Sequence, residues 1–412
     1  MIQVKTLKSG VRVIVKQMEG LLSVTMGILV GTGAAYETDK EDGISHFIEH
    51  MQFKGTSTRT AVQISDEFDD IGAQVNAFTG KEMTCYYAKA TSDRAAAAFE
   101  LLADLFLNAT FPETEMEREK GVVVEEIHMD EDSPEDLCLD LLARAAYGTD
   151  NYGRNILGPA ENVMGFTRED IAAYKLGRYC PENIVISFAG NIGIAEAEEL
   201  AERFFGDMPK GKYERREKNV LYRGDRLFKQ KPIEQAHFAF GFPTVSRDHD
   251  STSAVQLMNA VLGGGLSSRL FTKVREELGL AYSVYSYTSH YEETGLLGIY
   301  AGVNPQKAEG ARDAILEVIR TFKEKGITQR EFLRGKEQLK SSTIFSQENT
   351  SSQMLLYGKY LLYKNDVYDF EQKMKEISDL TEEDVKRAIA ENLDLTRASV
   401  SSVGNLKEGI SL

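Results

Sequence analysis

The feature of this 412-residue chain that most limits its fold is an internal repeat. Phe166-Thr-Arg-Glu-Asp-Ile171 reappears as Leu380-Thr-Glu-Glu-Asp-Val385, and Gly190-Asn-Ile192 reappears as Gly404-Asn-Leu406. The step from Phe166 to Leu380 equals the step from Gly190 to Gly404, so two separated stretches keep one register. A constant offset of this size, called here the repeat offset, indicates two copies of one fold within the chain.

Strand-like and helical patterns alternate irregularly in the first copy, which predicts an α+β fold rather than a series of βαβ units. The expected strands are 11–16, 22–30, 74–78, 83–89 and 183–189, and the expected helices are 44–53, 61–71, 93–107, 113–147 and one from 168. Turn and charged residues gather at 208–218. We therefore expect a first domain at 1–208, a linker at 209–230 and a second, duplicated domain at 231–412.

The charge balance argues against two classes of partner. The chain has 48 Lys plus Arg against 64 Asp plus Glu, a net charge of −16. Such a surface repels nucleic acid and anionic membranes, so we expect neither as a partner. The three cysteines, which are widely spaced, suit a reducing compartment, and the N-terminus is strand-like rather than a signal peptide. We expect a cytoplasmic protein.

Two histidines and a glutamate fall within five residues in Ser45-His-Phe-Ile-Glu-His-Met51. On a helix, His46 and His50 lie about 40° apart, and Glu49 projects from the same side. Two imidazoles suit zinc, and the free carboxylate could act as the base that takes a proton from a metal-activated water. The alternative is an ordinary polar helix face, but the order His-x-x-Glu-His is a zinc peptidase signature.

The repeat offers an internal comparison for this motif. The repeat offset places Ala260, Gly263 and Gly264 opposite His46, Glu49 and His50. The second copy therefore lacks the polar trio, which indicates that the trio serves a purpose other than folding.

A catalytic zinc site needs a third protein ligand, and the acidic segment 115–128 is the richest source. Glu119 and Glu126 are seven residues apart and share a helical face, whereas Glu125 points about 100° away. Most helix carboxylates are simply solvated, so the residues alone leave the choice among them open. At the repeat offset, Lys340 stands opposite Glu126.

Four stretches resemble the pitrilysin/insulinase superfamily of zinc peptidases, and the resemblance covers essentially the whole chain. They are His46-Phe-Ile-Glu-His-Met-Gln-Phe-Lys-Gly-Thr56, Val75-Asn-Ala-Phe-Thr-Gly-Lys-Glu-Met-Thr84, Glu117-Arg-Glu-Lys-Gly-Val-Val-Val-Glu-Glu-Ile127 and Ser268-Arg-Leu-Phe-Thr-Lys-Val-Arg-Glu-Glu-Leu-Gly-Leu-Ala-Tyr282. Length and layout are similar to the branch that holds the processing peptidase β-subunit and its bacterial relatives. The resemblance implies two related domains, each a mixed, mainly antiparallel sheet covered by helices, facing each other as a clamshell.

The resemblance also assigns roles to residues. His46, His50 and Glu126 would hold one Zn²⁺ per chain, Glu49 would be the general base and Glu119 would orient the site. Arg275 and Tyr282 match a pair from the second half that reaches the substrate near the metal; on their own they suggest a salt-bridged Arg and a packed Tyr.

The remaining implied residues concern the substrate. Asn76 and Ala77 match an edge strand to which relatives add the peptide as a further strand. Asp136 and Asp140 fall where processing peptidases receive an arginine, and they share a helical face; a solvated acidic surface explains them equally well. Gly263-Gly-Gly265 is only a remnant of the glycine-rich loop found in the processing peptidase α-subunit.

The expected activity is therefore that of a zinc endopeptidase acting on unfolded, basic peptides, and the branch implies a homodimer. The second hypothesis is a non-catalytic peptide-binding or scaffold subunit of a processing-peptidase-like complex, which would have lost the metal set. A third is a metal-dependent hydrolase of another small substrate, in which the edge-strand and Arg/Tyr segments have no evident role.

Overall fold

The computed structural model describes residues 1–412 except 212, 214, 215, 217 and 219. It divides into two compact units, each made of three separate stretches of chain. The first unit comprises Met1–Ile127, Asn155–Lys218 and Ile344–Asp369, and the second comprises His128–Arg154, Asn219–Thr343 and Phe370–Leu412. Each unit is built around its own sheet and its own hydrophobic core.

The first unit contains a six-stranded sheet in the order β1-β2-β6-β3-β5-β4. Its strands are β1 (Ile2–Thr6), β2 (Arg12–Gln17), β3 (Ser23–Val30), β4 (Gln74–Thr79), β5 (Thr84–Thr91) and β6 (Ile184–Gly190). Only the β2–β6 pair is parallel; the other neighbours are antiparallel. The central strands β3 and β6 are buried almost throughout, as expected for strands covered on both faces.

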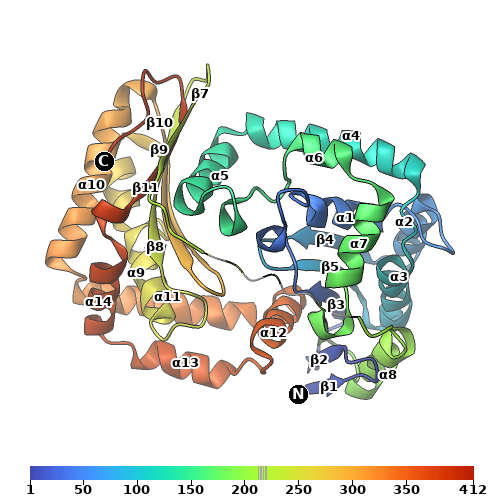
Figure 1. Ribbon diagram of the computed structural model, residues 1–412. Coiled ribbons are helices and arrows are strands. Elements are labelled where there is room, and N and C mark those ends of the chain that lie inside the picture. Colours follow the sequence, from blue (N-terminus) through green and yellow to red (C-terminus); the bar gives the residue numbers. More distant parts are fainter. Residues whose placement is uncertain (212, 214–215, 217, 219) are drawn as a thin grey trace. The chain divides into compact units, whose positions relative to one another are not determined.

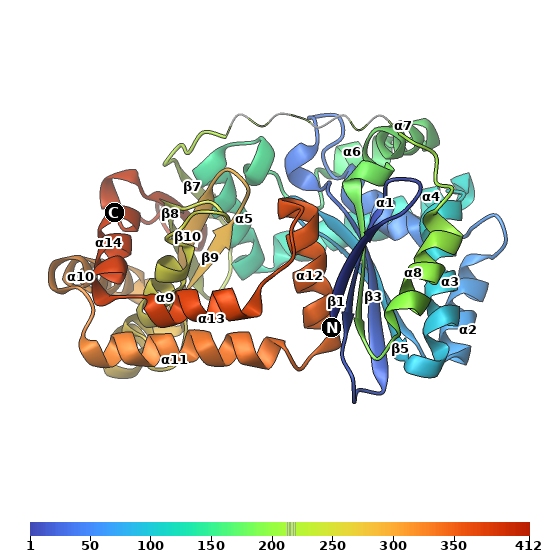
Figure 2. The same ribbon diagram turned by 90° about the horizontal axis from the view of Figure 1, so that it is seen from below.

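Helices cover both faces of this sheet (Figures 1 and 2). The first unit includes α1 (Ile44–Gln52), α2 (Ala61–Asp70), α3 (Ala95–Asn108), α6 (Ala160–Gly165), α7 (Arg168–Arg178), α8 (Ile194–Phe205) and most of α4 (Glu113–Asp132). The helices α3 and α8 pack on β5 and β2, and α12 (Thr350–Lys364) packs on β2, β3 and β6. Figure 2 shows α12 on the opposite side of the strands from α3 and α8.

The second unit repeats this architecture with five strands in the order β7-β11-β8-β10-β9. The strands are β7 (Arg226–Gln230), β8 (Ala236–Thr244), β9 (Ala281–His290), β10 (Gly295–Val303) and β11 (Ser399–Gly404). Its other elements are α5 (Pro134–Tyr147), α9 (Thr252–Leu262), α10 (Ala308–Lys325), α13 (Phe370–Asp379), α14 (Glu382–Asn392), most of α11 (Gln329–Ser346) and the π-helix η5 (Phe271–Glu277). The fold is α+β, with two mixed sheets that are each covered by helices.

The two copies exchange one helix. The helix α5 lies in the first half of the sequence but packs on β8 and β11 of the second unit. Its counterpart at the repeat offset is α12, which packs on the sheet of the first unit. Each compact unit is therefore completed by a helix from the other half of the sequence.

The repeat offset predicted from the sequence holds for most elements. The helix α7 (Arg168–Arg178) and its counterpart α14 (Glu382–Asn392) begin and end at equivalent positions, and so do the last residues of β6 and β11, Gly190 and Gly404. The register breaks at α9, which ends at Leu262, so Gly263 and Gly264 lie beyond the helix and are not the counterparts of Glu49 and His50. The inference that the second copy lacks the polar trio still stands, because α9 contains neither histidine nor glutamate.

Two local predictions differ from the structure. The helical pattern predicted at 113–147 is two helices, because Pro134 lacks the amide hydrogen that a continuous helix requires and instead begins α5. In the predicted linker at 209–230, the last residues form strand β7, and residues 212, 214, 215, 217 and 219 lie outside the described residues.

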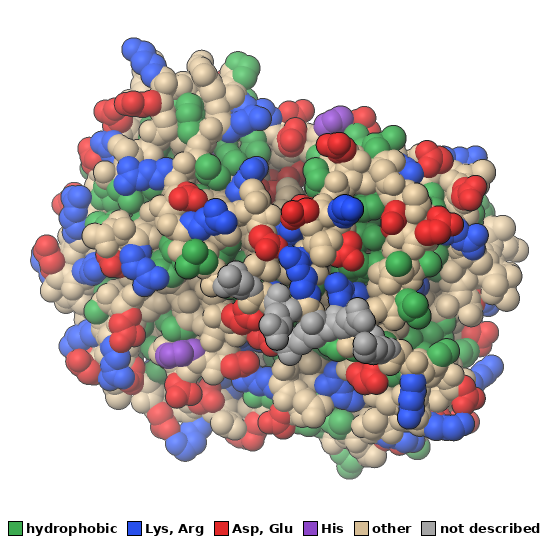
Figure 3. Space-filling model, viewed as in Figure 1, with side chains coloured by type: hydrophobic (Ala, Val, Ile, Leu, Met, Phe, Trp, Pro, Cys, Tyr) green, Lys and Arg blue, Asp and Glu red, His purple; other side chains and the backbone are tan. Residues whose placement is uncertain are grey.

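Acidic and basic side chains are interspersed on the face of the molecule seen in Figure 3. Among the described residues, no helix combines the length and the apolar character needed to cross a lipid bilayer.

Candidate metal centre

The helix α1, which carries the His-x-x-Glu-His motif, begins immediately after Gly43. This glycine has φ of +95°, a left-handed conformation, and a Cβ atom there would lie 2.5 Å from the carbonyl oxygen of Leu157. The apolar side of α1, with Phe47, Ile48 and Met51, is fully buried. The opposite side is thereby left for the polar residues of the motif.

Glu37 anchors the start of α1. Its carboxylate accepts hydrogen bonds of 2.8 Å from the backbone N–H groups of Gly43 and Ser45. The N-cap residue of α1 has no side chain that could cap the helix. The Glu37 carboxylate instead satisfies backbone N–H donors of the first turn. Burial raises the pKa of Glu37 to about 7, although the same hydrogen bonds oppose that shift. Glu37 therefore fixes the backbone directly before His46, the first residue of the motif.

His46, His50 and Glu126 converge, with one potential ligand atom from each within 4.8 Å of the others. Glu126 Oε2, from α4, lies 3.7 Å from His46 Nε2 and 3.4 Å from His50 Nε2. Donors about 2.0–2.1 Å from one tetrahedral zinc ion would be about 3.3 Å apart, so the group fits such an ion. The predicted trio of ligands is therefore brought together by α1 and α4.

The protonation of the two histidines differs. Burial, followed by the neighbouring charge of His50, lowers the pKa of His46 to about 3, so this ring is neutral. Burial also opposes protonation of His50, but Glu119, Glu126 and Glu49 outweigh it and raise the pKa of His50. Neutral imidazole is the form that binds a metal, so His50 must lose a proton to do so.

Glu119 is buried and contacts the side of the His50 ring that faces away from Glu126. Its carboxylate contacts His50 Nδ1 at 2.8 Å and Lys54 Nζ at 2.6 Å. When the neutral His50 ring donates a hydrogen bond from Nδ1 to Glu119, its Nε2 atom keeps a lone pair, which a metal ligand requires. Nε2 faces Glu126. Burial raises the pKa of Glu119, but the bonds from His50 and Lys54 prevail and lower it overall.

Glu49 is not among the three converging residues and keeps its carboxylate available. It accepts a hydrogen bond of 2.5 Å from the hydroxyl of Thr79, the last residue of β4. Burial raises the pKa of Glu49, and Glu126 adds to that shift, while Thr79 and His50 oppose it. A raised pKa brings a carboxylate closer to the range in which a general base is effective.

Strand β4, which carries Asn76 and Ala77, is at the edge of its sheet and pairs with β5. Asn76 is exposed, and its side chain bonds the backbone N–H of Ala77 at 2.8 Å. An edge strand of this kind presents backbone groups that a further strand could use.

Arg275 and Tyr282 lie together in the second unit. Arg275 is in the π-helix η5, a rare conformation that often marks functional positions. Its guanidinium lies 5.1 Å from the ring centre of Tyr282 and 4.8 Å from that of Phe271. Tyr282 is 78% exposed, so it is not the packed tyrosine of the alternative interpretation. The salt-bridged arginine of that interpretation is present, because Arg275 Nε lies 3.8 Å from Glu276 Oε1.

Asp136 and Asp140 lie on the same helix, α5, as their spacing predicts. Asp136 is exposed and accepts a hydrogen bond of 2.5 Å from the hydroxyl of Ser133, which precedes the helix.

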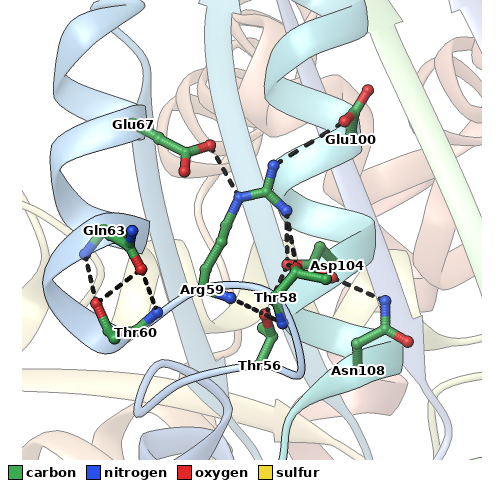
Figure 4. A network of polar contacts seen from close by, with 9 residues as sticks. All are labelled: Thr56, Thr58, Arg59, Thr60, Gln63, Glu67, Glu100, Asp104 and Asn108. Atoms are coloured by element: carbon green, nitrogen blue, oxygen red, sulfur yellow. Dashed lines mark hydrogen bonds and ion pairs between the residues drawn. The ribbon is translucent and has the colours of Figure 1, made fainter.

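The loop after α1 is fixed to α3 by a polar network (Figure 4). Arg59 binds Glu67 and Asp104, each at 2.8 Å, and Asp104 also accepts hydrogen bonds from Thr56 and Thr58. The network begins at Thr56, the last residue of the motif stretch. It therefore holds the chain on the C-terminal side of the metal-binding helix.

Sequence reasoning missed three residues of the site: Glu37, Lys54 and Thr79. Lys54 stands in the motif stretch, but its partner is Glu119 on α4, and their separation in the sequence concealed the contact. Thr79 stands in the stretch compared with the edge strand, but sequence separation from Glu49 concealed their bond. Glu37 offered no signal, because its role depends on how the chain turns before α1.

Two family models match the chain in succession: "Insulinase (Peptidase family M16)" at residues 12–160 and "Peptidase M16 inactive domain" at 165–339. An uncharacterized zinc protease of Bacillus subtilis is 42% identical over 410 residues, covering 98% of this chain and all of the relative. Another, from Streptomyces coelicolor, is 33% identical, covering 98% and 89% of the two chains.

A protease from Helicobacter pylori shares the fold, with a TM-score of 0.92 at 22% identity over 98% of this chain and 99% of that one. So does a Pseudomonas fluorescens structure titled as a peptidase M16 inactive domain, with the same TM-score at 23% identity over the full length of both chains. On the sequence matches, with the site geometry in agreement, this chain belongs to the insulinase family and is a zinc peptidase of family M16.

Proposed function

We propose that this peptidase is an endopeptidase for unfolded, basic peptides and that it uses one zinc ion per chain. The observation that carries the proposal is the convergence of His46, His50 and Glu126 within 4.8 Å beside the unassigned carboxylate of Glu49. Two imidazoles and a carboxylate are a donor set that zinc accepts in peptidases. The names of the bacterial relatives point to the same metal.

The proposed chemistry divides between the metal and the protein. A zinc ion bound to this trio would act as a Lewis acid and would lower the pKa of water to about 7. Glu49 takes the proton of the attacking water and delivers it to the leaving amine. Thr79 holds the Glu49 carboxylate in one orientation for both transfers.

We propose that the peptide binds as an additional strand along β4, at Asn76 and Ala77. Strand addition recognises the backbone and therefore tolerates many sequences, but it requires an extended and unfolded substrate. Arg275 and Tyr282 are proposed to contact the substrate, with the exposed Tyr282 hydroxyl donating a hydrogen bond to the developing oxyanion.

The preference for basic peptides rests on charge. The chain carries a net charge of −16, and Asp136 and Asp140 could hold an arginine side chain by charge-assisted hydrogen bonds. We further propose a cytoplasmic homodimer that uses neither nucleic acid nor a membrane as a partner.

The test is hydrolysis of an internally quenched, arginine-containing peptide by the zinc-loaded protein. Glu49→Gln and a chelated sample should both lose activity, whereas Glu125→Gln, an exposed carboxylate on α4, should keep it. Cleavage that survives Glu49→Gln would remove this residue as the base. A zinc-loaded protein that binds a varied peptide pool without cleaving it would support the alternative, a non-catalytic peptide-binding subunit of a processing-peptidase-like complex.

A further inference from the structure

The second unit contains a polar pocket of about 710 Å³ that none of the proposed catalytic residues lines. Its walls are the last turns of α10, the first turns of α11 and the segment 267–277, which includes η5. Five hydroxyl side chains line it: Ser267, Ser268, Thr272, Thr321 and Thr328. The pocket is therefore well supplied with hydrogen-bonding groups and is larger than a single small ion requires.

Five basic and three acidic side chains also line the pocket. Two of the basic residues are already paired. Arg269 makes two bonds of 2.7 Å to the carboxylate of Glu331, and Lys273 lies 3.1 Å from Glu277. These pairs neutralise one another and contribute little net charge to the pocket.

Three basic residues remain: Lys325 at the end of α10, and Arg330 and Arg334 on α11. Within the described part of the chain, none of the three has a carboxylate within ion-pair distance, and the acidic residue left over in the pocket is Glu317. Arg330 and Arg334 are four residues apart and share one helical face, and Arg334 is half-buried. The pocket thus has an excess of positive charge in a chain of net charge −16.

A half-buried guanidinium without a counter-ion is costly, and an anionic ligand would remove that cost. The planar fork of arginine matches the oxygens of a phosphate group in a bidentate arrangement, and hydroxyl groups complete such sites. The remaining carboxylate in the same wall, Glu317, would disfavour a large polyanion that spreads over the surface. These features select a small ligand with one phosphate group.

We propose that this pocket binds a phosphate group through Arg330, Arg334 and Lys325, either as free phosphate or as a small organic phosphate monoester. The proposal is separate from the peptidase mechanism, because none of the residues proposed for catalysis or metal binding lines the pocket. The pocket volume favours the monoester, whose organic part would occupy space that phosphate leaves open.

Calorimetric titration of the full-length, zinc-loaded protein at low salt tests the proposal, with inorganic phosphate and glycerol 3-phosphate as separate probes. We expect saturable binding of at least one probe and a loss of affinity of tenfold or more in the double variant Arg330→Gln/Arg334→Gln. The matched control is Arg320→Gln/Lys323→Gln, which removes the same charge from α10 residues outside the pocket. The affinity ratio of the two probes identifies the source of the phosphate group.

Glu317→Gln provides a variant whose expected effect, tighter binding, cannot result from misfolding. Removal of this carboxylate from the pocket should tighten binding about threefold, since a like charge near the anion is lost. Absence of saturable binding to both probes would overturn the proposal. So would an equal loss of affinity in the Arg320→Gln/Lys323→Gln control, or weaker binding by Glu317→Gln.

Discussion

The hydroxyl of Thr79, at the end of the edge strand β4, donates a hydrogen bond of 2.5 Å to the carboxylate of Glu49 on the metal-binding helix α1. The side chain of Thr79 therefore joins β4, the strand to which the substrate is proposed to add, to the proposed general base Glu49. A peptide that adds to β4 would lie next to the residue that orients the base. This contact makes Thr79 a positioning residue whose removal should change the proton transfer more than the binding of the substrate.

Thr79→Val should reduce kcat about tenfold and leave KM nearly unchanged. The hydrogen bond from Thr79 lowers the pKa of Glu49, so its loss should raise that pKa further. Because the base acts when ionised, the acidic limb of the kcat profile should move to higher pH. The pH dependence of quenched-peptide hydrolysis measures both effects.

Thr79→Ser is the matched control, because it keeps the hydroxyl and removes only a methyl group. It should keep both kcat and the position of the acidic limb close to those of the wild type. If Thr79→Val retained the wild-type pH profile, the bond would have no part in setting the state of Glu49.

Glu119→Gln should weaken zinc binding by about 10- to 100-fold, the usual effect of removing a group that orients a ligand. Glu119 contacts both His50 Nδ1 and Lys54, and the amide would keep the shape while losing the negative charge. Competition titration with a zinc-sensitive dye measures the affinity. Glu125→Gln, on the same helix but exposed, should leave the affinity unchanged, and an equal loss in both variants would contradict this role.

Zinc affinity should fall steeply as the pH falls through the raised pKa of His50. Neighbouring carboxylates stabilise the protonated ring in the metal-free protein, so zinc must displace that proton before it can bind. Above that pKa no proton is displaced and the affinity should level off. His46, with its pKa lowered to about 3, should contribute nothing over the same range. Equal affinities on both sides of the transition would show that His50 is already neutral without metal.

The sequence predicted the fold class and the common face of His46 and His50 because both depend on short-range patterns. His46 and His50 are one helical turn apart, so their common face follows from helix geometry alone. Glu126 is also on a regular helix, but helix geometry could not separate it from Glu119, and the resemblance to a family decided between them. The structure adds the reason: Glu119 is turned toward His50 Nδ1 and Lys54, and Glu126 toward the Nε2 atoms.

Contacts between distant segments were beyond sequence reasoning. The exchange of α5 and α12 between the two units depends on how the chain passes from one sheet to the other, which local propensity does not encode. The bond from Thr79 to Glu49 likewise depends on the packing of β4 beside α1. The repeat predicted two similar sheets but could not predict which helix would complete each of them.

From the network in Figure 4 we predict that Asp104 stabilises the loop that follows the metal-binding helix α1. Asp104 is 8% exposed and accepts bonds from Thr56, Thr58, Arg59 and Asn108. Asp104→Asn should lower the free energy of unfolding by about 2 kcal/mol, because Arg59 would lose a charged partner in a partly buried site. Chemical denaturation measures this loss, and Asp93→Asn, an exposed site, should be nearly neutral.

The effect of Asp104→Asn should also depend on pH. Burial opposes ionisation of Asp104, but the bonds from Asn108, Arg59 and Thr56 outweigh it and lower its pKa in the folded state. A carboxyl group with a lowered folded-state pKa contributes stability above its unfolded pKa, about 3.9, and loses that contribution as the pH falls. The difference between wild type and Asp104→Asn should therefore be largest near pH 7 and should shrink below pH of about 4. A difference that stayed constant across this range would mean that the cost of the substitution comes from shape and not from charge.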